Sequence, residues 1–286
     1  MSIQFDKVQP KTKEQLKQLI NYAFKHDIYD LNFIDTSKIT DMSWLFENVK
    51  HNFDISSWDV SNVTDTEFMF YFCVNFNCDL SGWDVSNVTN TKYMFACCEK
   101  FNCDLSNWNV SNVTNMSHMF FYCENFDINC FKSWDVSNVE NTSYMFYNCK
   151  NFNCDLSNWD VSNVTDMTSM FAFCNTFDCD LSNWDVSNVT GMYFMFGRCK
   201  QFNCDLSNWD VSNVTDMTSM FGYCNKFDCD LSNWDVSNVT DMYSMFTMCK
   251  NFKGKGLENW DVSKVEDIRY MFSGCDKMTI PSWYKY

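Results

Sequence analysis

NWDVSNVTDMTSMFGYCNKFDCDLS, residues 208–232, is the stretch that organises this chain, because most of the remaining sequence repeats it with substitutions. Nine tryptophans hold the same register, 25 residues apart except for 26-residue steps into the fourth and the ninth: Trp58, Trp83, Trp108, Trp134, Trp159, Trp184, Trp209, Trp234 and Trp260. A fixed period of this length predicts a solenoid in which every repeat forms one coil.

Each coil is expected to contain one strand and one short helix. Trp209 and Val211 alternate with polar residues, which predicts a short parallel strand with both side chains pointing inward. From Val214 to Cys224 the apolar residues step mostly by three, which predicts a short α- or 3-10 helix lying on the core. We therefore expect an α/β solenoid of about ten coils over residues 34–275.

The two ends of the chain depart from the repeat. In residues 1–33, Thr12 and Gln15 form a capping-box pattern, and an apolar helical stripe follows: Leu16, Leu19, Ile20, Ala23 and Phe24. This helix is predicted to cap the open end of the first coil, with an independent partner-binding helix as the alternative. Residues 276–286 are predicted to form a C-terminal edge or cap, in which Pro281 and Lys285 are typical of an edge that resists further strand pairing.

Composition excludes some classes of function. The formal net charge of −16 disfavours a nucleic-acid-binding role, because phosphate neutralisation needs a basic surface. The sequence holds no apolar run long enough to insert into a membrane and no signal-peptide pattern. The odd count of 17 cysteines fits reduced thiols, so a cytoplasmic, intracellular or virion location is favoured over secretion.

Most cysteines fall in two columns of the repeat. One column follows Met-Phe by three residues, and the other lies five residues later in six of the coils. Zinc ligation by stacked thiolates is one interpretation, and burial of cysteine as a small apolar side chain is the favoured one. Cys97 and Cys130 lie outside both columns and are the candidates for reactive thiols.

The residue after each tryptophan is Asp in all coils but one, where it is Asn109. Stacked one per coil, these carboxylates would lie about 5 Å apart and repel one another. Bound Ca²⁺ would compensate the charge, as would hydrogen bonds to turn amides and to the neighbouring Ser and Asn columns, the interpretation that we favour. A melting temperature that ignores millimolar Ca²⁺ and chelator would exclude the calcium site.

Variation between coils concentrates at the two residues before the second Met of each coil and at the two residues after its Met-Phe pair, where aromatic residues accumulate. Because the core columns are already filled, these rings are expected to be at least partly exposed and to form the partner-binding surface. The alternative is that many of them pack between coils and thicken the core. The candidate partner-binding residues are Phe68, Tyr71, Phe72, Tyr93, Phe121, Tyr122, Tyr144, Tyr147, Phe173, Tyr193, Phe194, Tyr223, Tyr243 and Tyr270.

The motif Leu-x-x-Trp-x-Val-x-x-Val-x-x-Met-x-x-Met-Phe-x-x-Cys-x-x-Phe resembles the BspA-like leucine-rich repeat surface proteins, and most closely the mycoplasma-type repeat domain of unknown function. The resemblance covers roughly residues 34–275. It implies a right-handed leucine-rich-repeat-like solenoid with a role in adhesion or protein binding. It transfers no functional residue, because the shared motif is a folding motif.

We therefore expect a non-enzymatic protein-binding or structural scaffold, with a surface adhesin or a virion component as specific forms. Its partner would be a protein or another copy of the chain. The alternative is a Ca²⁺- or carbohydrate-binding module that uses the Asp, Ser and Asn columns. The sequence shows no catalytic set, no phosphate-binding loop and no motif for a cofactor.

Overall fold

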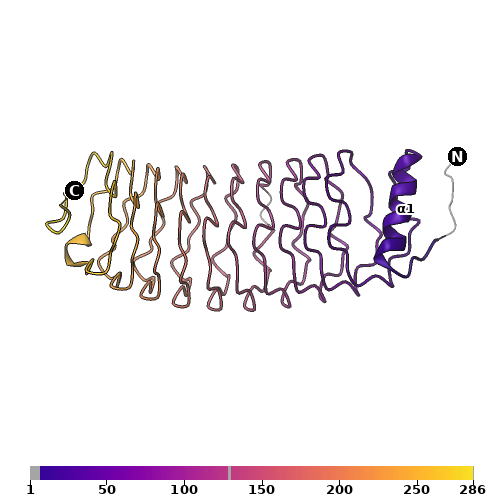
Figure 1. Cartoon of the computed structure of the whole chain (residues 1–286), viewed down its shortest axis with the longest axis horizontal. Coiled ribbons are helices and arrows are strands. Elements are labelled where there is room, and N and C mark those ends of the chain that lie inside the picture. Colours follow the sequence, from indigo (N-terminus) through magenta and orange to yellow (C-terminus); the bar gives the residue numbers. More distant parts are fainter. Residues whose placement is uncertain (1–6, 128–129, 286) are drawn as a thin grey trace.

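The computed structural model describes residues 7–127 and 130–285, in which successive repeats lie side by side along one long axis (Figure 1). We call each repeat a coil and name it by its tryptophan. Helix α1 lies at the N-terminal end of the stack, and residues near 280 lie at the other end. Residues 1–6 of the expected N-terminal cap and residue 286 of the expected C-terminal edge lie outside the described residues.

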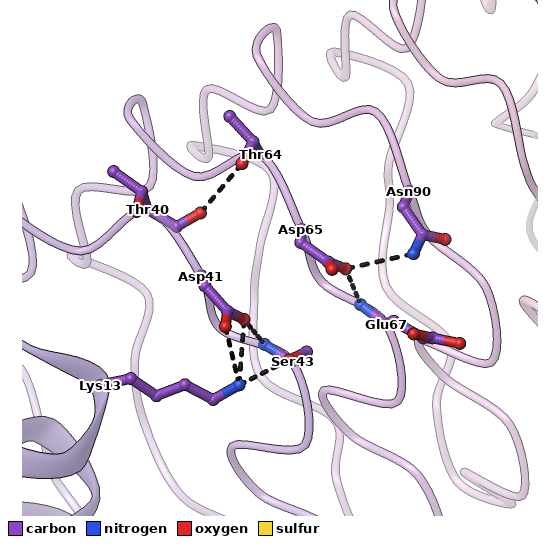
Figure 2. A network of polar contacts seen from close by, with 8 residues as sticks. All are labelled: Lys13, Thr40, Asp41, Ser43, Thr64, Asp65, Glu67 and Asn90. Atoms are coloured by element: carbon purple, nitrogen blue, oxygen red, sulfur yellow. Dashed lines mark hydrogen bonds and ion pairs between the residues drawn. The ribbon is translucent and has the colours of Figure 1, made fainter.

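Helix α1 (Lys13–Lys25) forms as the apolar stripe predicts. The Thr12 hydroxyl accepts the amide of Gln15 at 3.3 Å, while the Gln15 side chain accepts the amide of Lys11 at 2.8 Å, one residue before the position that a capping box would use. The buried face of the helix packs on the first coil. Lys13 adds a polar anchor, because its Nζ lies 3.0 Å from a carboxylate oxygen of Asp41 (Figure 2).

The internal structure of a coil differs from the expectation. Within the described residues the secondary structure consists of α1, the 3-10 helix η1 (Leu257–Asn259) and isolated parallel bridges. The expected strand at Trp209 and Val211 and the expected helix from Val214 to Cys224 are replaced by consecutive turns. For example, the amides of Trp209 and Val214 each donate to the carbonyl three residues earlier.

Carboxylate side chains explain why the strand does not form. In the Trp209 coil, Asp205, Asp210 and Asp216 each accept the amide two residues further on, at 2.9, 3.0 and 2.8 Å. Figure 2 shows the same turn at Asp41 and Asp65. The bonds at Asp205 and Asp210 flank the expected strand and bend the chain at both of its ends, and the bond at Asp216 forms a third turn.

Left-handed backbone at two positions per coil explains why the helix does not form. Ser219 and Tyr223 have φ angles of 53° and 64°, which no right-handed helix allows. Alternate amides therefore leave the coil and donate to carbonyls of the following coil 24 residues on, at 2.7–2.9 Å. In the Trp209 coil the donors are Met217, Ser219, Phe221 and Tyr223, and the acceptors are Asp241, Tyr243, Met245 and Thr247.

Side chains supply further bonds between coils in the opposite direction. The Trp209 indole Nε1 donates to the Leu181 carbonyl at 3.0 Å, and the Asn213 side chain donates to the Ser187 carbonyl at 2.7 Å. A threonine row also links backbones, as the Thr64 amide donates to the Thr40 carbonyl at 2.8 Å. These bonds compensate polar groups that the turns would otherwise leave unpaired.

The core is one continuous stack of apolar columns. Trp209 and Val211 point inward as expected, with exposed fractions of 2% and 1%. Phe196 and Phe221 of adjacent coils stack at a ring-centroid distance of 5.7 Å. Each buried phenylalanine contributes about 2–3 kcal/mol of burial energy, so the stack depends on its aromatic columns.

The 26-residue step into Trp260 is absorbed outside these columns. Gly256, at φ 92°, precedes η1, and the indole of Trp260 still reaches the Leu231 carbonyl at 3.2 Å. A turn therefore accommodates the extra residue, as expected. The other extra residue, before Trp134, falls in a segment that includes residues 128–129, which lie outside the described residues.

Candidate interaction surface

In every coil, two residues that flank the Met-Phe pair have left-handed backbone, and we call this segment the Met-Phe turn. All occupants of these positions have φ between 53° and 74°. The first outer column contains Trp44, Phe68, Tyr93, His118, Tyr144, Ser169, Phe194, Ser219, Ser244 and Tyr270. The second outer column contains Asn48, Phe72, Cys97, Tyr122, Asn148, Phe173, Arg198, Tyr223, Met248 and Gly274. Non-glycine residues pay about 1 kcal/mol or more for this backbone, so the stack must enforce it.

The first outer column is an unbroken aromatic stack in its N-terminal half. Ring-centroid distances along Trp44, Phe68, Tyr93, His118 and Tyr144 are 3.8, 4.4, 4.1 and 4.6 Å, with interplanar angles of 20° or less. Because the ring faces cover one another, the stack presents ring edges to solvent. Such a surface suits apolar and edge-to-face contacts with protein side chains.

A pocket of about 330 Å³ opens beside this stack, between Phe72, Phe121 and Tyr122. Glu99 and Glu124 contribute to its lining, so apolar rings adjoin carboxylates. We call the first outer column from Trp44 to Tyr144, together with this pocket and the rings of Tyr71 and Tyr147, the aromatic strip.

The C-terminal half of the surface is built differently. Serines interrupt the first outer column there, and Arg198 lies between two rings of the second, 5.3 Å from the Phe173 centroid and 4.5 Å from the Tyr223 centroid. The guanidinium replaces a ring as the stacking partner. The aromatic content therefore falls from the N-terminal half of the surface to the C-terminal half.

The structure places all fourteen predicted aromatic residues at the surface, five of them with more than a third of their area exposed. These five are Phe72, Tyr122, Tyr193, Tyr223 and Tyr270. The others are partly exposed, and many of them contact rings of neighbouring coils, so partial exposure and packing between coils both occur. Trp44 and His118 were missed, although they occupy the register of Phe68 and Tyr93, and that shared register is the signal that would have found them.

His118 is the only histidine in this stack. Its Nδ1 is buried and has no hydrogen-bond partner among the described residues. Burial, with a smaller contribution from Lys92, lowers the pKa of His118 to about 4, while Asp166 acts in the opposite direction. The imidazole is therefore neutral at pH 7 and packs as an aromatic ring.

Replacing His118 with Phe should flatten the dependence of stability on pH. A histidine pKa that is depressed in the folded state makes the unfolded chain bind more protons. The natural chain should therefore lose on the order of 1–3 kcal/mol as the pH falls from about 6.5 to about 4. Urea unfolding at pH 7, 5.5 and 4.5 measures this loss. Tyr93→Phe is the matched control and should lose as much stability with falling pH as the natural chain does. If H118F lost as much as well, His118 would not be the group responsible.

The cysteine columns are buried, except for the partly exposed Cys275 at the C-terminal end, and their thiols form hydrogen bonds. Cys224 Sγ donates to the Phe196 carbonyl of the preceding coil at 2.9 Å, and the same contact recurs along its column. The two candidates for reactive thiols do not meet the electrostatic requirement. Burial raises the pKa of Cys97 and of Cys130 to about 11, which suppresses the thiolate.

The Asp column after the tryptophans lies in exposed turns. Asp185, for example, accepts the Ser187 amide at 3.0 Å, and hydrogen bonds from the Ser187 side chain and backbone lower the pKa of this carboxyl. The expected bonds to turn amides are therefore confirmed. Among the described residues, no group of three or more His, Cys, Asp or Glu side chains is arranged to hold a metal ion.

Comparisons with known proteins agree with the repeat. Residues 14–131, 123–227 and 204–284 each match the model of a family described as "Mycoplasma protein of unknown function, DUF285". No curated protein matches the chain. Within the described part of the chain, no helix is long and apolar enough to cross a membrane.

Proposed function

The chain belongs to the DUF285 family, and we propose that it is a non-enzymatic protein-binding or structural scaffold whose partner docks on the aromatic strip. The partner is a protein or a further copy of the chain. The right-handed, leucine-rich-repeat-like solenoid and the BspA-like affiliation are part of this proposal, with a surface adhesin or a virion component as its specific forms.

The exposed aromatic strip is the observation that carries the proposal. Soluble proteins rarely keep aromatic side chains exposed in a contiguous row, and such rows are typical of interfaces. The five stacked rings and the neighbouring exposed side chains of Phe72 and Tyr122 form a row of this kind. The columns are set by a rigid backbone, so binding costs little conformational entropy.

The repeated polar residues support a structural rather than a catalytic role. The carboxylates of the Asp columns accept turn amides, and the thiols of the main Cys column donate to carbonyls of the preceding coil. Groups that are committed to the same bond in successive coils maintain the stack. Differences between coils, which a specific partner would read, concentrate on the outer columns.

Site-specific photo-crosslinking in the native assembly tests the proposal. A photoreactive phenylalanine analogue at Tyr122 should form an adduct with one defined protein, whereas the same analogue at Asn213, in the column of inter-coil asparagines, should not. Phe72→Ser should lower the adduct yield at position 122 severalfold, because it removes part of the same pocket. Tyr22→Ser, which changes an exposed ring on α1, is the matched control. Adducts from position 213 alone would overturn the proposal.

A further inference from the structure

The stack has a polarity that is set by its backbone hydrogen bonds. At each interface along the Met-Phe turns, amides at alternate positions donate to carbonyls of the following coil. At the final interface the donors are Met242, Ser244, Phe246 and Met248, and the acceptors are Asp267, Arg269, Met271 and Ser273. The side of a coil that faces the C-terminal end is therefore a donor edge.

The last coil presents this donor edge unpaired. Its amides are those of Ile268, Tyr270, Phe272 and Gly274, and no described residue accepts a hydrogen bond from them. The segment after residue 275 turns instead towards the tryptophan side of the stack, where Trp283 Nε1 reaches the Leu257 carbonyl at 2.7 Å. The Tyr284 ring of this segment also packs against Phe272, with 4.9 Å between the ring centroids, but the four amides stay unpaired among the described residues.

An apolar pocket lies next to the open amides. It has a volume of about 490 Å³ and is lined by Arg269, Tyr270, Phe272, Ser273, Ile280 and Tyr284. Tyr270 and Ile280 are 60% and 49% exposed, which makes them two of the most exposed large apolar side chains of the described chain. Inside the stack, the same position is filled by the apolar columns of the next coil.

We infer that this edge binds an extended segment of a second polypeptide that carries the same coil consensus, aligned parallel to residues 268–274. The eight-residue core of that consensus, Asp-Met-x-x-Met-Phe-x-x, followed by Cys, supplies alternate carbonyls and two apolar side chains for the pocket. Addition of such a segment repeats an interface that the chain forms at each of its internal coils. The site is separate from the aromatic strip.

The hydrogen-bonding polarity excludes two simpler occupants. Two open donor edges cannot pair with each other, because each offers amides, and the carbonyls of residues 267–273 already accept hydrogen bonds from the preceding coil or from within their own coil. The complementary acceptor edge of the first coil lies under α1, which Lys13 holds against Asp41 and Ser43. Among its described residues, an intact second copy therefore offers no free acceptor edge along its Met-Phe turns, whereas an unpaired segment does.

Charge also favours a segment of this consensus. Residues 250–286 contain seven Lys or Arg against five Asp or Glu, although the whole chain has a net charge of −16. Arg269 occupies the position at which Thr218 donates to Asp241 of the following coil, at 2.7 Å. The guanidinium, which now pairs with Asp267 at 2.5 Å, is placed to meet the aspartate of an incoming coil.

A labelled peptide with the sequence of residues 236–252, VSNVTDMYSMFTMCKNF, tests the inference with the full chain. Fluorescence anisotropy should show saturable binding, and hydrogen exchange should slow in residues 268–274 and not elsewhere along the stack. A scrambled peptide of the same composition should do neither. Absence of saturable binding, or binding without protection of residues 268–274, would overturn the inference.

Reversing the charge at Arg269 tests the proposed register of the bound segment. Arg269→Glu, at an exposed side chain, should raise the Kd of the peptide at least about fivefold, and a peptide with Lys in place of its Asp should recover part of that loss. Lys277→Glu changes the net charge equally at a residue that bonds Asn251, away from the donor edge. Equal weakening by both variants would show that only the overall charge matters and would contradict the proposed register.

Discussion

Replacement of Trp209 with Ala is expected to destabilise the chain by about 3–5 kcal/mol, as large-to-small changes of buried aromatic residues do. The side chain is 2% exposed, its indole donates to the Leu181 carbonyl, and its ring lies 6.1 Å from that of Phe196. Because each coil contacts mainly its neighbours, a defect in the middle of the stack weakens two interfaces at once. The expected result is a lower midpoint of unfolding and a transition that is no longer a single cooperative step.

Urea unfolding followed by tryptophan fluorescence and by hydrogen exchange measures this effect. Trp209→Phe keeps an aromatic ring and loses the indole hydrogen bond. Its free energy of unfolding should therefore lie between those of the natural chain and W209A. Trp283→Ala, at the C-terminal end, removes a partly buried ring that contacts one coil. It should lower the free energy of unfolding by less than W209A does. A smaller loss for W209A than for W283A would show that the stability of the stack does not depend on its middle.

Most cysteines are expected to react with a thiol reagent at least about 1,000-fold more slowly in the native chain than in the unfolded chain. Fifteen cysteines are buried, and only Cys97 and Cys275 are partly exposed. Burial raises the pKa of both of these thiols to about 11, which lowers the thiolate fraction at neutral pH by roughly 300-fold relative to a free cysteine. Even the two accessible thiols should therefore react slowly.

A disulfide-exchange reagent at pH 7.5, with and without 8 M urea, checks this expectation. Labelled peptides should identify Cys97 and Cys275 first, and Cys97→Ser should remove one of the two early products. Raising the pH to 9.5 should accelerate both by about 100-fold, because the reaction follows the thiolate. Rapid native labelling of the buried cysteines of the Met-Phe-x-x-Cys column, which are all of its members except Cys275, would contradict the buried, hydrogen-bonded arrangement.

The residue pattern predicted part of the candidate surface. Variation around Met-Phe identified the aromatic positions, since columns that hold the core vary little. It did not identify Trp44 or His118 as members of the stack, because histidine is not an aromatic marker in a composition count and the first repeat is degenerate. The ring contacts depend on the spacing between coils, a property of the assembled stack.

The sequence by itself determined the period, the residues of the buried columns, the N-terminal helix and the Asp turns, because each follows from local spacing and side-chain chemistry. Only the tertiary structure decided the backbone inside a coil. Residues such as Tyr93 and Phe194 prefer right-handed backbone, yet they adopt φ angles of 56° and 53°. Their amides thereby reach carbonyls one coil away, and those non-local bonds and the stacked core outweigh the local cost. The residue pattern within one repeat does not reveal these hydrogen bonds, because donor and acceptor lie in different repeats.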